Sequence, residues 1–530
     1  MKKTDVFTEL VIYQIYPRSF YDTNSDGIGD LNGITEKVGY FKELGVNAVW
    51  LCPCYKSPNV DNGYDISDYR DIMDDFGTFA DWKRMVKTLH ENGIKVIMDL
   101  VPNHTSDKHK WFVESRKSKD NEYSDYYYWF DKPPNGWKSA FGGSAWEYVP
   151  ERGQYYLHSY AEGQPDLNWD NPKVRKEICD VIDFWVDNGV DGFRIDVIDQ
   201  ISKNIHGENY FGPDLHKYIR EMFGREKTAG LFTVGECWAE DIEEFVRHCG
   251  RKRNELKSLF QFDHINKGRI DRFTPAPFTL KEITDRLSFW QKQTISRGVP
   301  YVLFTDNHDN SRFLSRYGND RELRYESAAM FAGMIYLLRG IPIIYQGQEF
   351  GVTNSHHNSF SDFRDVENVW FYEKNKDKIP ERELFERLNF GSRDNARRPM
   401  PWNGGKNGGF TEGTSWIPLY SRYKEINLEN DKTSQKSVFE FYKELLRFRK
   451  KTAAILYGDF EEITADNQNC FVYKRSFENE TYVVVCNFES RNDINIYGLN
   501  GKLSFGNYFR ENRNLSGVYE PYELAVYKVL

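Results

Sequence analysis

The sequence lacks a basic excess, a long apolar run and a dense set of cysteines. Its 71 lysines and arginines are outnumbered by 80 aspartates and glutamates, and the formal net charge is −9. Nucleic-acid-binding proteins usually carry a positive surplus, so we expect no such partner. No run approaches the roughly 18 apolar residues of a membrane span. The first ten residues, MKKTDVFTEL, contain two lysines but no apolar stretch, so we expect neither a secretory signal nor a membrane partner.

Cysteine is sparse as well. Seven cysteines are scattered over 530 residues, mostly inside apolar runs, and their number is odd. In a chain of this length the pattern indicates reduced core thiols in a cytoplasmic protein. Cys52 and Cys54 form a C-x-C pair at a strand end, which we interpret as buried structural cysteine rather than a metal or redox site. The sequence contains no H-E-x-x-H and no C-x-x-C motif.

Aromatic residues, in contrast, are abundant. They make up 16% of the chain, within a composition that is 39% hydrophobic and 28% charged. That balance is typical of soluble globular proteins. The aromatic surplus fits either a large core or a surface on which sugars stack. The length predicts two to four domains.

Eight short, nearly continuous apolar runs recur along the chain, as expected of strands buried on both faces. Helical patterns lie between them, and residues 81–93 and 174–189 each place their apolar side chains on one face. Eight strand–helix units predict an α/β fold, a (β/α)₈ barrel of the TIM type. The predicted strands are 11–17, 46–51, 95–101, 192–197, 231–236, 258–262, 301–306 and 341–347.

Two long segments interrupt the barrel pattern. Residues 104–171 are rich in Tyr, Trp, Gly and Asp, and we interpret them as a loop-rich subdomain inserted after strand 3. Residues 350–435 are polar and Gly-rich, and we expect a second loop system there. A helix at 437–450 then closes the barrel. The predicted division is a catalytic barrel of residues 1–103 and 172–452, the insertion, and a C-terminal all-β domain of sandwich type at 453–530, where the pattern alternates.

Polar residues stand where the predicted strands end. In a barrel of this kind, side chains at the carboxyl ends of strands are the catalytic candidates. Strand 3 ends near Asp99, strand 4 carries Arg194 and Asp196, strand 5 ends in Glu236, and strand 7 runs into 306–309. Buried structural ion pairs would explain any one of these positions. Three carboxylates and two histidines on four strand ends favour an active site instead.

The environment of each carboxylate predicts its role. Arg194 lies on the same side of the strand as Asp196, so we expect the guanidinium to hold the pKa of Asp196 low. Glu236 follows an apolar run, which predicts a raised pKa. One ionised and one protonated carboxyl form the pair that cleaves glycosidic bonds.

Several segments together resemble glycoside hydrolase family 13, the α-amylase family. They are DLVPNHT (99–105), QPDLNW (164–169), GFRIDVI (192–198), VGECW (234–238), TDNHDNSR (305–312) and SRDNARRPMPW (392–402). More narrowly, the chain looks like the oligo-1,6-glucosidase and dextran-glucosidase subgroup. The resemblance runs from about Tyr13 to the end of the chain.

The resemblance implies a retaining enzyme that works by double displacement. Asp196 matches the nucleophile, Glu236 the general acid/base, and Asp309 the third carboxylate that holds the sugar hydroxyls and distorts the ring. His104 and His308 match histidines that hydrogen-bond the glucose.

The exo-acting subgroup closes its pocket behind the non-reducing glucose with an aspartate–arginine pair, and the motifs place this pair on Asp61 and Arg397. Tyr64 would be the stacking platform under the glucose. The other substrate-binding candidates implied by the resemblance are Phe141, Tyr160, Gln164, Arg194, Val197 and Trp238.

Val197 directly follows the nucleophile position and bears on bond specificity. If it continues the strand, its side chain points away from Asp196 and borders the aglycone through the neighbouring loop. In relatives of this subgroup, Val here goes with α-1,6 preference, and Ala or Thr with α-1,4. A plain β-branched strand residue is the alternative interpretation.

An oxygen-rich loop lies near the N-terminus. In DTNSDGIGD, the side chains of Asp22, Asn24, Asp26 and Asp30 and the carbonyl of Ile28 occupy alternate positions. This is the spacing of a Ca²⁺ loop, although the bidentate Glu of an EF-hand is missing. Subgroup members bind Ca²⁺ or Mg²⁺ there, so we expect a structural cation and no organic cofactor. A solvated acidic turn is the alternative.

The function expected from the resemblance is an exo-α-1,6-glucosidase that acts on small isomalto-oligosaccharides. Three alternatives stay open: an α-1,4-preferring or broad α-glucosidase, a trehalose-6-phosphate hydrolase, and a sucrose-type glucosyl transferase. A phosphate-binding enzyme needs added Lys or Arg near the aglycone, and no basic cluster is evident in the assignable loops. A non-catalytic relative is disfavoured because all three carboxylates are present. The sequence leaves the oligomeric state open.

Overall fold

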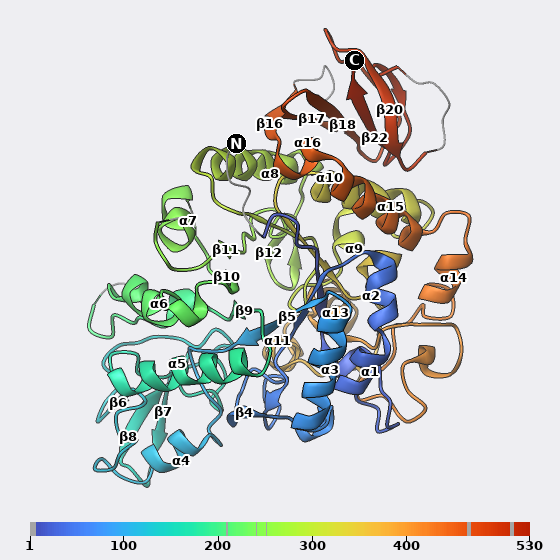
Figure 1. The fold of residues 1–530 in the computed structure, drawn as a ribbon. Helices are drawn as coiled ribbons and strands as arrows, with labels where there is room; N and C mark the ends of the chain where they lie inside the picture. Colours follow the sequence, from blue (N-terminus) through green and yellow to red (C-terminus); the bar gives the residue numbers. More distant parts are fainter. Residues whose placement is uncertain (1–6, 208–209, 240, 251, 464–467, 509–513) are drawn as a thin grey trace.

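In the computed structural model the chain winds around a barrel of eight parallel strands (Figure 1). The structure describes residues 7–207, 210–239, 241–250, 252–463, 468–508 and 514–530. The sheet order is β11-β10-β9-β5-β2-β1-β15-β14. Each of the eight predicted strands is confirmed. Their bounds are β1 Ile12–Ile15, β2 Ala48–Leu51, β5 Lys95–Leu100, β9 Gly192–Ile195, β10 Phe232–Gly235, β11 Ser258–Leu259, β14 Val302–Leu303 and β15 Ile341–Tyr345.

The barrel closes between its first and last elements. β1 pairs with β2 on one side and with β15 on the other, so the first strand of the barrel lies beside the last. The edge strand β11 is joined to the segment just before the other edge strand, β14, because the Ser258 hydroxyl donates to the carbonyl oxygen of Pro300 at 3.0 Å. Each strand is buried along most of its length, as its continuous apolar pattern predicts.

Helices follow the strands and cover the barrel. The predicted helix at 437–450 is confirmed as α15 (Val438–Lys451), and the other two predicted helices are confirmed as α3 (Phe79–Glu91) and α5 (Pro172–Asp187), each of these two starting two residues earlier than its apolar pattern. Caps explain the earlier starts, since Thr78 and Asp81 form a capping box and Asn171 caps α5 ahead of Pro172. The other helices of this layer are α1 Leu31–Glu36, α2 Val38–Leu44, α6 Leu215–Phe223, α7 Ile242–Cys249, α8 Leu280–Arg297, α9 Phe313–Tyr317 and α10 Arg324–Tyr336.

The insertion after β5 has a small core of its own. It holds α4 (Lys110–Ser115) and a three-stranded antiparallel sheet in which β8 lies between β6 and β7. Lys203 and Asp166 form an ion pair of 3.0 Å with both side chains fully buried, and this pair ties the insertion to the loop after β9. The strands are β6 Trp129–Phe130, β7 Trp146–Val149 and β8 Gln154–Leu157. Two further two-stranded sheets elsewhere in the chain pair β3 Tyr55–Lys56 with β4 Asp68–Ile72 and β12 Arg269–Asp271 with β13 Thr274–Pro275.

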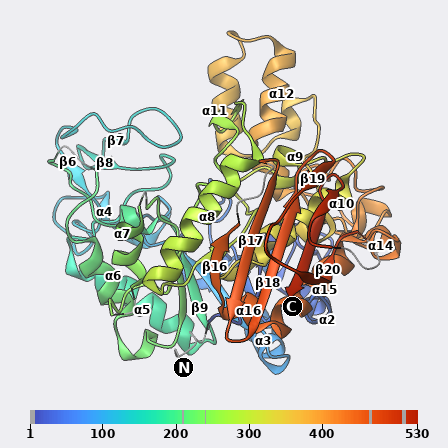
Figure 2. The ribbon, with the colours of Figure 1, turned by 90° about the horizontal axis from the view of Figure 1, so that it is seen from above.

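The long segment after β15 is more ordered than a loop system. α11 (Val366–Asn375) and α12 (Glu381–Gly391) form a helical pair that projects from the barrel (Figure 2). They bury a compact apolar cluster that includes Phe371, Leu384 and Leu388. These few apolar residues stand among many charges, which explains why the polar composition suggested loops. Two shorter helices follow, α13 Asp394–Arg397 and α14 Leu428–Thr433.

The C-terminal region is all-β after one short helix, α16 (Ala453–Tyr457), as predicted. Its five-stranded antiparallel sheet, shown in red at the top of Figure 1, has the order β16-β17-β18-β22-β20. One face joins the main core, and the other packs with the β19–β21 pair. The strands are β16 Asp459–Glu462, β17 Cys470–Phe477, β18 Glu480–Asn487, β19 Asn492–Ile494, β20 Gly501–Gly506, β21 Gly517–Tyr519 and β22 Leu524–Val529. In the described part of the chain, no helix has the length and apolar character needed to cross a membrane.

Candidate active site

The carboxyl ends of the barrel strands surround a cavity of about 300 Å³. All three predicted catalytic carboxylates line it, and seven of the predicted substrate-binding residues do so too. The four others, Gln164, Arg194, His308 and Arg397, lie directly behind the lining. The lining residues among the predictions are Asp61, Tyr64, His104, Phe141, Tyr160, Asp196, Val197, Glu236, Trp238 and Asp309.

One guanidinium organises the centre of the cavity. Arg194, on β9, contacts Asp196 Oδ1 at 2.7 Å through Nη1 and Glu236 Oε2 at 2.6 Å through Nη2. Its Nη1 also contacts Asp99 Oδ1 at 2.9 Å, and the arginine itself is buried. The strands β5, β9 and β10 are neighbours in the sheet, so their ends bring the three carboxylates together. Asp196 and Glu236 therefore lie side by side at the cavity floor.

The expected low pKa of Asp196 is wrong. Burial raises the pKa of Asp196 well above its ordinary value, Arg194 lowers it only in part, and the charges of Glu236 and Asp99 raise it further. Three carboxylates face one guanidinium here, so the surplus of negative charge favours a proton within the group. A site that retains one proton among paired carboxyls suits acid/base chemistry.

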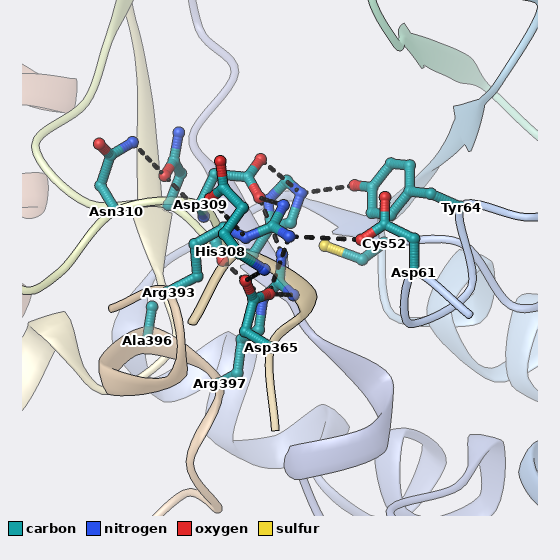
Figure 3. Close-up of polar contacts among 12 residues, drawn as sticks. Cys52, Asp61, Tyr64, His308, Asp309, Asn310, Asp365, Arg393, Ala396 and Arg397 are labelled. Atoms are coloured by element: carbon teal, nitrogen blue, oxygen red, sulfur yellow. Dashed lines mark hydrogen bonds and ion pairs between the residues drawn. The ribbon is translucent and has the colours of Figure 1, made fainter. Parts of the chain in front are cut away.

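Asp309 forms a tight ion pair with His308 (Figure 3). His308 Nε2 lies 2.9 Å from Asp309 Oδ2 and 2.6 Å from the hydroxyl of Tyr64. Burial alone would lower the pKa of His308, but the facing Asp309 raises it to about 10. Burial would likewise raise the pKa of Asp309, yet His308, Arg397 and Arg393 hold it well below its usual range. Asp309 is thus ionised where it lines the cavity.

The wall of the pocket at Asp61 differs from the expected Asp61–Arg397 pair. Arg393 contacts Asp61, with 3.4 Å from Nη2 to Oδ1. Arg397 instead lies beneath, fully buried, with its two terminal nitrogens 2.7 Å from Asp365 and 2.9 Å from Asp309. The two arginines are four residues apart, at the N-cap and the last turn of α13, so both face the same acidic cluster (Figure 3).

The SRDNAR motif contained both arginines, but spacing alone could not decide which one reaches the wall. Asp365 joins the two, because Arg393 Nη2 also contacts its Oδ2 at 2.8 Å. Neither Arg393 nor Asp365 was singled out in the sequence. The sequence does contain two arginines one helical turn apart, and an aspartate at the start of a helix. Their pairing is evident only once the fold brings α13 next to the N-terminus of α11.

The other predicted substrate-binding residues form a polar and aromatic rim around Asp61. Gln164 donates to Asp61 at 3.3 Å and contacts His104 at 3.2 Å. Burial lowers the pKa of His104 to about 4, so its imidazole is neutral. Tyr160 packs edge-on against Phe141, with 5.6 Å between ring centroids. Tyr64 is stacked on His308, with 5.4 Å between the ring centroids, which fixes the orientation of the Tyr64 ring.

Val197 does not continue the strand. β9 ends at Ile195, and Val197 has φ 35° and ψ 48°, a left-handed conformation that costs a β-branched residue about 1–3 kcal/mol. Val197 lies among the cavity-lining residues, as expected of a residue that borders the aglycone, but a left-handed turn and not strand alternation places it there. Trp238 lies at the open side, 52% exposed and stacked on Phe262 at 4.7 Å.

Two further arginines, absent from the sequence predictions, line the open side of the cavity. Arg272 is paired with Glu367 at 2.6 Å. Arg269 donates to Asn310 at 3.1 Å, and no carboxylate partner is found for it among the residues that the structure describes. Burial and the nearby Arg316 and Arg272 lower the pKa of Arg269 to about 9. Their hairpin, β12–β13, follows β11 in a stretch that the sequence did not mark as functional.

The loop 22–30 keeps its oxygens close but uses them internally. Asp22 accepts hydrogen bonds from the backbone N–H groups of Ser25 and Gly27, at 2.7 and 2.8 Å. Asp30 caps α1 by accepting from Gly33 N at 2.7 Å, and Asn24 donates to Asp26 at 2.9 Å. Within the described residues, no three His, Cys, Asp or Glu side chains gather in a group that could hold a metal ion. The carboxylates of this loop alone therefore make no cation cage.

Comparison with known proteins agrees with this geometry. Residues 14–458 match the family model "Alpha amylase, catalytic domain". The chain belongs to the α-amylase family. It is 44% identical to the oligo-1,6-glucosidase of Parageobacillus thermoglucosidasius over 98% of both chains, and 42% identical to the trehalose-6-phosphate hydrolase of Bacillus subtilis (strain 168) over 92% of this chain and 90% of that one. Isomaltulose synthase from Erwinia rhapontici NX5 superimposes with a TM-score of 0.95, at 37% identity and full coverage of both chains.

Proposed function

We propose that this α-amylase-family enzyme is a retaining exo-α-glucosidase that cleaves non-reducing-end α-1,6-glucosidic bonds of isomalto-oligosaccharides. The observation that carries the proposal is the bridge from Arg194 to both Asp196 and Glu236, beside a pocket wall made by Asp61 and Arg393. The relatives that match over nearly the whole chain at 42–44% identity include three named oligo-1,6-glucosidases.

The residues account for each step of a double displacement. With the proton that the carboxyls share placed on Glu236, Asp196 attacks the anomeric carbon as a carboxylate while Glu236 gives that proton to the departing glycosidic oxygen. A water molecule then loses a proton to Glu236, and its oxygen displaces Asp196 from the anomeric carbon. Arg194 contacts both carboxylates, so it keeps them aligned and compensates whichever one is charged. Asp309, ionised against His308, accepts hydrogen bonds from the sugar ring hydroxyls.

The closed and open ends of the cavity favour an exo mode. Asp61 and Gln164 are buried at one end, whereas Trp238 is half exposed at the other. A single terminal glucose fits between them, and the rest of the substrate extends toward Trp238. The decisive experiment is glucose release from isomaltose, panose, maltose, sucrose, trehalose and trehalose 6-phosphate, with NMR of the first product. Isomaltose as the best disaccharide and α-glucose as the first anomer are expected, and β-glucose first would rule out the retaining mechanism.

A phosphorylated aglycone is the second candidate, favoured by Arg269 and by the trehalose-6-phosphate hydrolase relative. Arg272 is already neutralised by Glu367, which leaves one uncompensated guanidinium at the open side. In the same substrate panel, trehalose 6-phosphate cleaved faster than isomaltose would establish this alternative.

We also propose that loop 22–30 binds Ca²⁺ or Mg²⁺ as a structural ion. Support comes from the alternate spacing of Asp22, Asn24, Asp26, the Ile28 carbonyl and Asp30 on a turn that Gly27 allows with φ 90°. The ion would require Asn24 and Asp26 to exchange their mutual hydrogen bond for the metal.

A cytoplasmic location is proposed on the thiols. All seven cysteines are free, and six of them are buried, which suits a reducing compartment. Fractionation of the producing cell, with activity in the soluble internal fraction, tests it.

A further inference from the structure

The turn after the nucleophile is connected to the loop that carries the acid/base. Ile198 N donates to the carbonyl oxygen of Glu236 at 3.0 Å, and Val197 N approaches Glu236 Oε2 at 3.4 Å. A third contact uses a side chain outside the predicted site, since the backbone N–H of Trp238 donates to Asp199 Oδ2 at 3.2 Å. Two functional residues, Glu236 and Trp238, thus stand on a loop that Asp199 holds.

The turn itself needs such support. Val197 sits in a left-handed conformation that a β-branched residue avoids, so its surroundings must hold it there. Asp199 lies two residues further on, in the short 3₁₀ helix Ile198–Gln200, and is buried. Its hydrogen bond to Trp238 N therefore braces the strained turn and the acid/base loop against each other.

Asp199 is also unusual chemically. Its second oxygen, Oδ1, is buried and has no hydrogen-bond partner among the described residues. Burial raises the pKa of Asp199 to about 7; the hydrogen bond from Trp238 N opposes the shift, and the nearby charges of Glu236 and Glu244 add to it. A carboxyl held in this way is costly for the fold. Its hydrogen bond from Trp238 N, on the loop after β10, is a functional contact that would account for this cost.

We propose that Asp199 is a positioning residue. It holds the loop 236–238 in place, and it thereby keeps the acid/base Glu236 where its proton can reach the glycosidic oxygen. This inference rests on the proposed roles of Asp196 and Glu236. Asp199 touches neither the sugar nor the reacting atoms, so its loss should weaken proton donation more than nucleophilic attack.

Two substrates separate these effects. Isomaltose needs a proton on its leaving oxygen, whereas 4-nitrophenyl α-glucoside departs as a stable phenolate. For Asp199→Ala we expect kcat/KM to fall at least ~10-fold on isomaltose but less than ~3-fold on the nitrophenyl substrate. Asp199→Asn keeps an oxygen acceptor for Trp238 N and should stay within ~3-fold of wild type on both.

Ser202→Ala is the matched control. Ser202 lies on the same segment and accepts from Asp214 N at 3.2 Å, away from Glu236. It should lower the melting temperature without changing the ratio of the two substrates. If Asp199→Ala does not fold, Asp199→Ser replaces it, with the same expected ratio.

An equal loss on both substrates, or no loss on either, would overturn the proposal. Failure of the proposed function looks different, because Glu236→Gln would then also lack the selective loss on isomaltose. If Glu236→Gln shows that loss and Asp199→Ala does not, only the positioning role is wrong.

Discussion

At the scale of single residues, Asp196 and Glu236 share one arginine yet have different tasks. Each variant, Asp196→Asn and Glu236→Gln, should lose at least ~10³-fold in kcat on isomaltose, because each removes one step of the double displacement. With 4-nitrophenyl α-glucoside, the Glu236 variant should form the glucosyl-enzyme faster than the Asp196 variant. Pre-steady-state release of nitrophenol measures this step. A faster Asp196 variant would reverse the two assignments.

A second prediction at the residue scale is that Val197 sets the preference between α-1,6 and α-1,4 bonds. Its methyl groups line the cavity, where a rigid α-1,4 aglycone would meet them and an α-1,6 aglycone has one more rotatable bond with which to avoid them. One or two methyl groups are worth about 1–3 kcal/mol. We expect Val197→Ala to raise the maltose-to-isomaltose ratio of kcat/KM by roughly 10-fold. An unchanged ratio would show that Val197 serves the backbone turn alone.

At the scale of elements, the short helix α13 presents two arginines with separable roles. Arg393→Ala should raise KM for short and long substrates alike, since Arg393 pairs with Asp61 at the terminal glucose that all of them share. Arg397→Ala should instead destabilise the fold, by about 3–5 kcal/mol, because it removes a fully buried guanidinium that contacts both Asp365 and Asp309 and leaves Asp365 with Arg393 as its remaining arginine partner. Michaelis constants and urea unfolding of both variants test the division. Equal effects on stability would contradict it.

The loop 22–30 is a second element whose effect should be structural. Added Ca²⁺ should raise the melting temperature, and EDTA should lower it, while kcat below the transition stays within ~2-fold. Asp26→Asn removes one ligand charge from an exposed side chain, so this variant should lose the calcium-dependent shift in melting temperature. Loss of activity in EDTA without any change in melting would contradict a structural ion.

At the scale of the whole molecule, the C-terminal sheet is part of the main core. Arg475 donates to the carbonyl oxygen of Leu337 at 2.7 Å, and Asn507 donates to that of Glu326 at 3.1 Å. Gly333 on α10 approaches Leu524 so closely that a Cβ would lie 2.1 Å from its Cδ2. A chain ending at Tyr457 should therefore be insoluble on expression, whereas removal of the exposed Leu530 should have no effect on solubility or melting. Soluble, active protein from the first truncation would show an independent barrel.

Much of this architecture was predictable because its signals are local. The eight strands follow from apolar runs bounded by polar ends, and strand ends of a parallel barrel must share one face, which places Asp196, Glu236 and Asp309 together. Non-local facts were not predictable. The partner of Asp61 depends on how a helix one turn long docks, and the pKa of Asp196 depends on how many carboxylates surround Arg194. The left-handed turn at Val197 interrupts the alternation of side chains along the strand, and no local sequence pattern predicts this turn.

The wall formed by Asp61 and Arg393 also fixes the order in which the products leave. Glucose held between that wall and the aglycone cannot depart until the aglycone has gone, and the water that completes turnover must come through the same opening. The enzyme therefore cannot slide along a chain: each cut ends with full dissociation, and the shortened chain must be rebound from solution. Oligosaccharides should accordingly shorten in a distributive series, with every intermediate length present in the bulk, and at high sugar concentration the vacated opening admits another sugar as readily as water.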